Sequence, residues 1–226
     1  MIVAIDGPAG AGKSTIARHL AERLGFAFLD TGAMYRAVAL AALQRGLGDG
    51  DAEAIAKLAQ SLTIDFDGRR TLLDGEDVST AIRTSEVSAA VYLAADNISV
   101  RRRLVELQRQ IAAGRDLVTE GRDQGTVAFP HAECKIFLTA SSRERARRRY
   151  EELISRGESI TFDEVLAQQL DRDQRDATRP VGALIKADDA VEVLTDGLTP
   201  EGVVERLEEI VGARVQGSEL RVQGKH

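Results

Sequence analysis

Short apolar runs recur along the chain, and the segments between them repeat apolar residues every three or four positions. Uniformly apolar or β-rich runs are typical of strands covered on both faces of a parallel sheet. Five such runs are present: Ile2–Ile5, Phe26–Leu29, Leu117–Thr119, Lys135–Leu138 and Ala190–Leu194. Ile16, Leu20 and Leu24 follow the first run with helical spacing, and Gly25 then supplies a stop. Alternating strands and helices predict an α/β fold, a parallel sheet with helices on both faces.

The last helical segment has a clear start. Thr199-Pro200-Glu201 reads as an N-cap followed by proline at the first helical position. An apolar stripe follows, made of Val203, Val204, Leu207, Ile210 and Val211. The chain turns polar after Gly212, so we expect residues 213–226 to be a disordered tail.

Two segments interrupt the alternation of strands and helices. Residues 62–84 contain short β-rich runs separated by turns at Asp67-Gly68 and Asp74-Gly75, which predicts a small inserted antiparallel sheet. The stretch from Ser141 to about Arg179 is almost entirely helix-forming and rich in arginine, with Gly157 as its clear break.

Composition narrows the class of protein. The 226 residues are 43% hydrophobic and 29% charged, as in an ordinary globular domain, and the net charge of −6 argues against nucleic acid or a membrane surface as partner. One cysteine, Cys134, excludes an internal disulfide and suits a reducing compartment. No run approaches the about 18 apolar residues of a membrane span. We therefore expect a cytoplasmic protein.

The strongest motif lies between the first strand and the first helix. Gly7, Gly12, Lys13 and Ser14 complete the pattern G-x-x-x-x-G-K-[ST], whose backbone N–H groups bind phosphate oxygens. We expect Lys13 to bridge the β- and γ-phosphates of ATP and Ser14 to bind Mg²⁺. The predicted ATP-binding residues are Gly7, Pro8, Ala9, Gly10, Ala11, Gly12, Lys13, Ser14 and Thr15. The alternative is a glycine-rich turn that arose by chance. No Asn-Lys-x-Asp run is present, which excludes a guanine-reading GTPase.

Polar residues follow the next strands where such a sheet binds ligands. After the second, Thr31 could cap the following helix and Arg36 could reach an anion. After the third, Glu120 is the candidate second anchor for Mg²⁺, through water, and Arg122 and Asp123 offer a bidentate cation and a hydrogen-bond acceptor. The plainer alternatives are that Thr31 is merely a helix cap, that Arg36 is a solvated charge, and that Arg122 and Asp123 form a surface ion pair.

The arginine-rich segment adds two further patterns. Arg172, Asp176 and Arg179 share one helix face, which alone would suggest an internal ion-pair ladder. Five cations lie within seven residues: Arg143, Arg145, Arg147, Arg148 and Arg149. Either they pair with nearby glutamates on a solvated helix, or they belong to a flap that closes over ATP, excludes water and stabilises the transferring phosphoryl group. On the second reading, Lys13, Arg145, Arg148 and Arg149 are the catalytic residues.

With these motifs the chain resembles the bacterial cytidylate kinases, of the nucleoside monophosphate kinase group, from Ile2 to about Val211. The matching segments are Ile5–Pro8, Leu29–Arg36, Gly75–Ser79 with Ile82–Thr84, Gly121–Asp123 with Gly125–Val127 and Phe129–Pro130, Lys135–Ser141, and Arg172–Asp173 with Asp176 and Arg179. The inserted sheet is also a mark of the bacterial enzymes.

The resemblance implies a three-part kinase domain over 1–212. Its core would comprise 1–30, 96–140 and 185–212, its nucleoside monophosphate-binding insertion about 31–95, and its helical lid about 141–180. Carried over by position, Thr31, Tyr35 and Arg36 resemble the acceptor-phosphate site. Arg101, Arg122 and Asp123 resemble the group that reads cytosine and the adjoining phosphate. Arg172 and Asp176 resemble ribose contacts, and Arg179 a residue that reaches the phosphates.

The chain departs from the family pattern at Tyr92, Gln124, Ala183 and Leu194, and none of these departures removes a residue that the pattern uses to handle phosphate. The implied reaction is transfer of the γ-phosphoryl group of MgATP to CMP, and also dCMP, by a monomer. Two rival hypotheses stay open. One is a P-loop kinase with another acceptor, such as UMP, AMP or shikimate, and the other is an ATP-binding module without turnover.

Overall fold

The computed structural model describes the backbone of residues 1–223 and the side chains of residues 1–215. Its internal contacts divide the chain into two compact units. The core unit comprises Met1–Leu29 and Gly114–His226, and the insertion unit comprises Asp30–Ala113.

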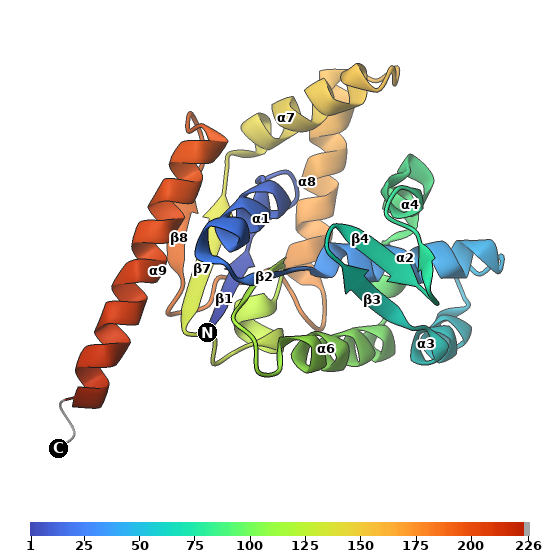
Figure 1. Cartoon of the computed structure of the whole chain (residues 1–226). Helices are drawn as coiled ribbons and strands as arrows, with labels where there is room; N and C mark the ends of the chain where they lie inside the picture. Colours follow the sequence, from blue (N-terminus) through green and yellow to red (C-terminus); the bar gives the residue numbers. More distant parts are fainter. Residues whose placement is uncertain (224–226) are drawn as a thin grey trace. The chain divides into compact units, whose positions relative to one another are not determined.

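The sheet of the core unit has five strands in the order β2-β6-β1-β7-β8 (Figure 1). Their bounds are β1 Ile2–Asp6, β2 Ala27–Asp30, β6 Leu117–Gly121, β7 Cys134–Thr139 and β8 Val191–Leu194. β1 pairs in parallel with both β6 and β7, and β7 pairs in parallel with β8. The predicted α/β fold and all five predicted strands are confirmed. Because the strands are parallel, β1, β6 and β7 end at the same edge of the sheet.

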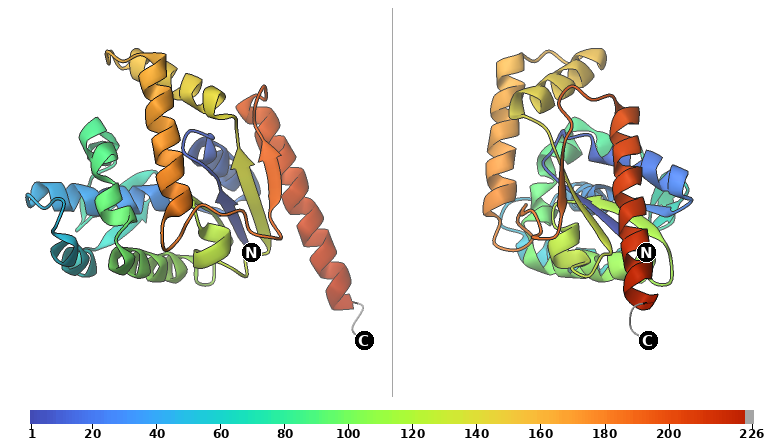
Figure 2. Two further views of the ribbon diagram at one scale, coloured as in Figure 1. Left: turned by 180° about the vertical axis from the view of Figure 1, so that it is seen from behind. Right: turned by 90° about the vertical axis from the view of Figure 1, so that its left-hand side faces the viewer.

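Helices α1 (Lys13–Leu24) and α9 (Pro200–Gln223) pack on one another and on the core sheet. Ile16 and Leu20 of α1 join Leu207 of α9 in one buried cluster with Ile5 and Ile136 of the strands. The predicted stop at Gly25 and start at Thr199 are both confirmed. Figure 2 shows α9, in red, running beside β7 and β8.

The predicted disordered tail is not what the structure shows over most of its length. α9 continues through Gln223, past Gly212, so residues 213–223 extend the helix. The remaining residues, 224–226, lie outside the described residues. Polarity misled the prediction because a helix that is anchored by an apolar stripe near its start can propagate into polar sequence at little cost.

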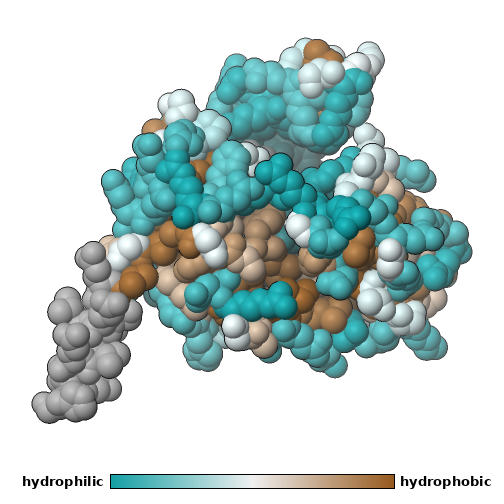
Figure 3. All heavy atoms as spheres, in the orientation of Figure 1, coloured by the Kyte–Doolittle hydropathy of each residue, from teal (hydrophilic) through white to brown (hydrophobic). Residues whose placement is uncertain are grey.

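The arginine-rich segment forms α7 (Ser142–Ser155) and α8 (Phe162–Thr178), which pack against each other through Ala146, Leu153 and Val165. Gly157 lies in the break between them, as predicted. A capping box between Thr161 and Glu164 starts α8. On the face shown in Figure 3, the side chains over this part of the chain are mainly hydrophilic.

The insertion unit is mainly helical, and its predicted antiparallel sheet is confirmed as β3-β4-β5. The elements are α2 Thr31–Gln44, α3 Ala52–Ser61, β3 Ile64–Asp67, β4 Arg70–Leu73, β5 Glu76–Asp77, η1 Ala81–Arg83, α4 Ser85–Ala90, α5 Tyr92–Ala95 and α6 Ile98–Ala112. The sequence suggested a boundary near residue 95, whereas the compact unit ends at Ala113. The difference arises because α6 packs on α2, α3 and α5. No helix in the described part of the chain is long and apolar enough to cross a membrane.

Candidate active site

The phosphate-binding loop joins β1 to α1 at the carboxyl edge of the core sheet. A Cβ atom on Gly7 would collide with the Leu138 carbonyl oxygen of the neighbouring strand, so this position requires glycine. Gly12 adopts a left-handed conformation, with φ of 87°, and caps α1. The loop backbone and the helix N-terminus are thereby both available to an anion, as the motif predicted.

Lys13 is buried inside this loop, with 5% of its surface exposed, and its Nζ donates to the Pro8 carbonyl oxygen at 2.8 Å. Burial, together with the charges of Arg122 and Arg172 and against the opposing effect of Glu120, lowers the pKa of Lys13 to about 7. Three cations that disfavour one another are an arrangement that a polyphosphate would stabilise. The position of Lys13 is thus compatible with a role in binding phosphate.

Ser14 and Glu120 meet beside the loop. The Ser14 hydroxyl donates to Glu120 Oε1 at 2.7 Å, and Glu120 is buried at the end of β6. A hydroxyl and a carboxylate are hard oxygen ligands of the kind Mg²⁺ takes, usually with phosphate and water completing its shell. Within the described residues, no three His, Cys, Asp or Glu side chains gather as a metal site. The pair thus fits an ion held jointly with a phosphorylated substrate.

Arg122 connects the loop after β6 to α8. Its Nε donates to Asp176 Oδ2 at 2.7 Å, and Arg179 donates to the other oxygen of Asp176 at 2.8 Å. Burial acts to raise the pKa of Asp176, but Arg122, followed by Arg179 and Arg172, lowers it to about 2. The structure therefore brings together four of the predicted substrate residues: Arg122, Arg172, Asp176 and Arg179.

Asp123 is 3% exposed and starts a single turn of π-helix, η2 (Gln124–Ala128). The residue that holds this turn is Asp6, the last of β1, which was not among the predicted site residues. Its carboxylate accepts from the backbone N–H groups of Gln124 at 2.8 Å and Gly125 at 2.7 Å. Burial raises the pKa of Asp6 to about 6 despite these two bonds. An acidic residue that ends an otherwise apolar buried run was the available signal.

The lid arginines divide into two kinds. Arg145 is buried, forms a bidentate ion pair with Asp173 at 2.9 and 2.7 Å, and donates to the Ala9 carbonyl oxygen of the phosphate-binding loop at 3.1 Å. Arg148 shares features of both kinds, since it donates to Thr195 and also pairs with Glu144 of its own helix. Arg147 and Arg149, by contrast, pair with glutamates of their own helix, the plainer of the two predicted alternatives. In the described conformation, Arg145 therefore stabilises the phosphate-binding loop through its hydrogen bond to Ala9.

In the insertion unit, the predicted acceptor residues Thr31, Tyr35 and Arg36 lie on α2 and Arg101 lies on α6. The Arg101 guanidinium is buried, stacks 5.3 Å from the centre of the Tyr35 ring and donates to the Ala95 carbonyl oxygen.

The prediction that Thr31 caps the following helix is wrong. Asp30 caps α2 instead, because its carboxylate accepts from Ala33 N at 2.9 Å and Thr31 is already helical.

Asp30 also pairs with Arg83 at 3.4 Å, a residue of the 82–84 motif to which sequence analysis gave no role. Tyr92, a departure from the family pattern, donates its hydroxyl proton to Asp49 at 2.9 Å. Gln124, another departure, accepts from Thr119 at 2.8 Å beneath the Asp123 turn. Both polar groups therefore have defined partners within their own units.

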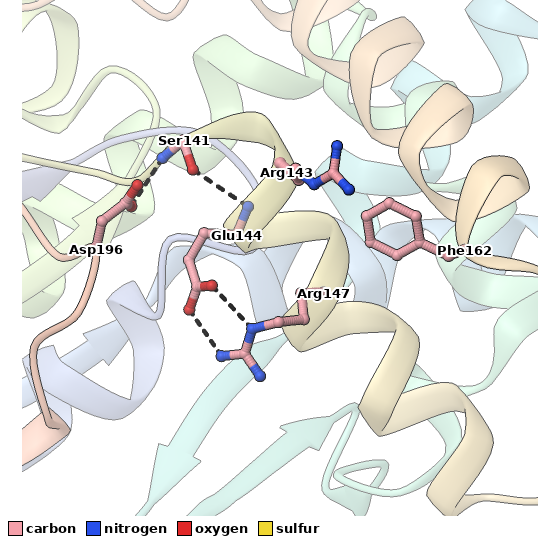
Figure 4. A pocket seen from close by; sticks show the side chains of 6 residues that line it. All are labelled: Ser141, Arg143, Glu144, Arg147, Phe162 and Asp196. Atoms are coloured by element: carbon pink, nitrogen blue, oxygen red, sulfur yellow. Dashed lines mark hydrogen bonds and ion pairs between the residues drawn. The ribbon is translucent and has the colours of Figure 1, made fainter.

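A shallow cavity of about 440 Å³ lies elsewhere, between the start of α7, the start of α8 and the loop after β8 (Figure 4). Its lining includes Arg143, Arg147, Phe162 and Asp196. Arg147 is already paired with Glu144, as the dashed lines of Figure 4 show, and Arg143 stacks on Phe162. None of the predicted site residues lines this cavity.

A phosphate-binding loop at the edge of a parallel sheet, a buried lysine, a Ser–Glu pair and arginines from two helices define a P-loop phosphotransferase. Comparison with known proteins supplies the family: the Cytidylate kinase family matches residues 3–213. The chain belongs to the cytidylate kinase family, and it is accordingly a kinase that uses ATP.

Two cytidylate kinases match this chain along almost their whole length. The cytidylate kinase of Rhodopirellula baltica is 50% identical over 218 residues, which cover 96% of this chain and 95% of that one. The cytidylate kinase of Carboxydothermus hydrogenoformans is 48% identical and covers 95% and 98%. Among solved structures, shikimate kinase from Bacteroides thetaiotaomicron has a TM-score of 0.50 at 13% identity and covers 94% of this chain and 98% of that one. At that identity the likeness concerns the fold alone.

Proposed function

We propose that this kinase transfers the γ-phosphoryl group of ATP to CMP, and also to dCMP, giving CDP or dCDP and ADP. The observation that carries the proposal is the Arg122–Asp176–Arg179 cluster with the adjoining buried Asp123, in a core unit that also holds the phosphate-binding loop. The names of the similar proteins support the same acceptor.

The proposed mechanism is direct in-line transfer, without a nucleophilic side chain. The acceptor phosphate is already ionised at neutral pH, so no general base is needed. Lys13 and the loop backbone would hold the donor phosphates, and Arg148 and Arg149 would stabilise charge on the transferring group after lid closure. Arg145 would contribute by fixing the loop through Ala9.

We propose Ser14, and Glu120 through water, as the protein groups that hold Mg²⁺. When bound, the ion would neutralise charge on the phosphate oxygens. The short hydrogen bond between Ser14 and Glu120 supports this assignment because it brings a hydroxyl and a carboxylate to one place.

For the acceptor, we propose that Asp123 accepts from the exocyclic amine of cytosine, a donor that uracil lacks, with Arg101 and Arg122 beside the base and phosphate. Arg172 and Asp176 would contact the ribose, and Arg179 the phosphates. Within the insertion unit, Thr31, Tyr35 and Arg36 would bind the acceptor phosphate.

Product analysis across a panel of acceptors tests this proposal. Purified enzyme with MgATP is incubated separately with CMP, dCMP, UMP, AMP, shikimate and no acceptor, and nucleotides are separated by ion-exchange chromatography. CMP and dCMP should be converted fastest. Preference for UMP, AMP or shikimate would support the rival kinase, and no conversion with any acceptor would support a binding module.

We further propose a cytoplasmic monomer. A single buried thiol, Cys134, whose pKa burial raises to about 11, is compatible with a reducing compartment. Light scattering coupled to gel filtration tests the oligomeric state, and a mass near 24.4 kDa is expected for the monomer.

A further inference from the structure

A buried carboxylate stands at the end of β1, directly before the phosphate-binding loop. Asp6 is 5% exposed and immediately precedes Gly7. Both of its oxygens are engaged with one turn: Oδ1 accepts from Gln124 N at 2.8 Å and Oδ2 from Gly125 N at 2.7 Å. Its carboxylate thus joins the strand that leads into the donor-phosphate loop to the segment after β6.

The two bonds fix the backbone that follows Arg122 and Asp123. The Asp123 carbonyl oxygen accepts from Val127 N at 2.8 Å and Ala128 N at 3.0 Å, which closes the turn of η2. Gln124 and Gly125 are the first residues of that turn, and their N–H groups point towards Asp6. Single turns of π-helix are frequent at functional sites, where they re-aim a neighbouring side chain.

The turn and the carboxylate fit closely. A Cβ atom on Gly125 would lie 3.4 Å from Asp6 Oδ2 and 3.2 Å from Cδ of Lys135. Lys135 in turn donates to the Pro130 carbonyl oxygen at 2.6 Å, beyond the far end of η2. The turn is therefore held at its start by Asp6 and just past its end by Lys135.

We infer that Asp6 is a positioning residue that sets Arg122 and Asp123 for the acceptor nucleotide by fixing the backbone of the η2 turn. This inference rests on the proposed acceptor role of Arg122 and Asp123. A carboxylate suits the task because it offers two acceptor oxygens to two adjacent N–H groups, whereas the amide of asparagine offers one oxygen and would direct its own N–H at the second donor.

If Asp6 served only to stabilise the fold, its replacement would have a different effect on kinetics and stability. Keeping a carboxylate buried here is costly, since burial raises the pKa of Asp6 to about 6. Asp6→Asn removes that cost and one hydrogen bond together, so the fold should change little in stability while the turn loses its geometry. A positioning role therefore predicts a kinetic defect without a matching loss of stability.

The test compares Asp6→Asn with Glu133→Gln. Glu133 also accepts a backbone N–H of β1, that of Ile2 at 2.8 Å, but at the opposite end of the strand. We measure KM for CMP, KM for MgATP, kcat and the urea midpoint. Asp6→Asn should raise KM for CMP about tenfold and leave KM for MgATP within about threefold, and Glu133→Gln should change neither.

An Asp6→Asn variant with an unchanged KM for CMP, or with equal increases in both KM values and a lowered midpoint, would overturn the inference. If Asp6→Asn does not fold, Gly125→Ala serves, since its methyl group would crowd Cδ of Lys135 at 3.2 Å and touch Asp6 Oδ2 at 3.4 Å, which disturbs the η2 turn while the carboxylate stays. It should raise KM for CMP selectively by about threefold, and no selective change would equally overturn the inference. If the wild-type enzyme does not phosphorylate CMP, the proposed function is refuted instead. The KM values of the variants are then compared for the nucleoside monophosphate that the enzyme does phosphorylate.

Discussion

Charged side chains at the carboxyl edge of the core sheet are buried, and each has a defined electrostatic environment. Asp176 lies between Arg122 and Arg179, whereas Asp6 accepts from two backbone N–H groups. The pKa values separate accordingly, to about 2 for Asp176 and about 6 for Asp6. The neighbouring groups therefore shift the pKa values of these two aspartates of the core unit in opposite directions.

Replacement of Asp123 tests the reading of the base. Asp123→Ala removes the proposed acceptor for the exocyclic amine but leaves the phosphate-binding loop intact. We expect KM for CMP to rise at least about tenfold and KM for MgATP to stay within about threefold. Steady-state kinetics give both values, with the exposed Asp188→Ala as control. Equal losses for CMP and ATP would refute a base-reading role.

Asp6 also predicts a pH dependence of stability. An ordinary aspartate has a pKa of 3.8, and that of Asp6 is raised to about 6, with Asp123 among the causes that raise it and Lys13 among those that lower it. The native state therefore keeps a proton that the unfolded chain releases, so the contribution of Asp6 to stability is full below about pH 4 and is lost as pH rises through 6.

Urea unfolding from pH 4 to 7 measures this contribution. Two pKa units correspond to about 3 kcal/mol, so the stability of the wild type relative to Asp6→Asn should fall by about 2–3 kcal/mol over that range. Parallel pH profiles for the two proteins would show that Asp6 titrates normally in the native state.

At the scale of elements, α7 and α8 contact the phosphate-binding loop through one polar cluster. Arg145 and Gln169 both donate to the Ala9 carbonyl oxygen, at 3.1 and 3.0 Å, and Asp173 accepts from both. The lid helices therefore share hydrogen bonds with the loop that holds the donor phosphates. Loss of Asp173 would leave the buried Arg145 without its ion-pair partner.

Two aspartates of α8 make a matched comparison. Asp173 pairs with Arg145, which is 6% exposed, whereas Asp171 pairs with Arg175 in an i,i+4 contact exposed to 53% and 65%. Asp173→Ala should cost about 2–3 kcal/mol and raise KM for MgATP, while Asp171→Ala should cost less than about 0.5 kcal/mol. Urea unfolding and ATP kinetics check both, and similar costs for the two variants would contradict the proposed support of the loop.

Strands and helix ends could be predicted from the sequence where a single local pattern determines them. Apolar runs located all five core strands, and Gly25 and Thr199 located two helix ends. Interactions between distant residues were not predictable in the same way. The Asp6 bonds to Gln124 and Gly125 span more than a hundred residues, and the burial of Arg145 depends on Asp173 from another helix. Helical spacing predicted a common face for Arg172, Asp176 and Arg179, but not that Asp176 binds Arg122.

At the scale of the whole molecule, a chain of net charge −6 has to bind polyanionic nucleotides. The proposed site residues meet this requirement by concentrating cations locally rather than by net charge. Lys13, Arg122 and Arg172 act electrostatically on one another in the core unit, whereas Arg145, Arg147 and Arg149 of α7 are paired with acidic side chains. Local fields of this kind bind phosphate in a protein that is acidic overall.

The most direct test of the central claim follows the γ-phosphoryl group itself. Enzyme, CMP and ATP carrying ³²P at the γ position are incubated, and the label is traced among CDP, inorganic phosphate and protein. We expect one labelled CDP molecule for each ADP formed by the wild type, and almost no labelled CDP with Lys13→Ala. Label released as inorganic phosphate or retained on the protein, or near-normal transfer by Lys13→Ala, would contradict direct transfer at this site.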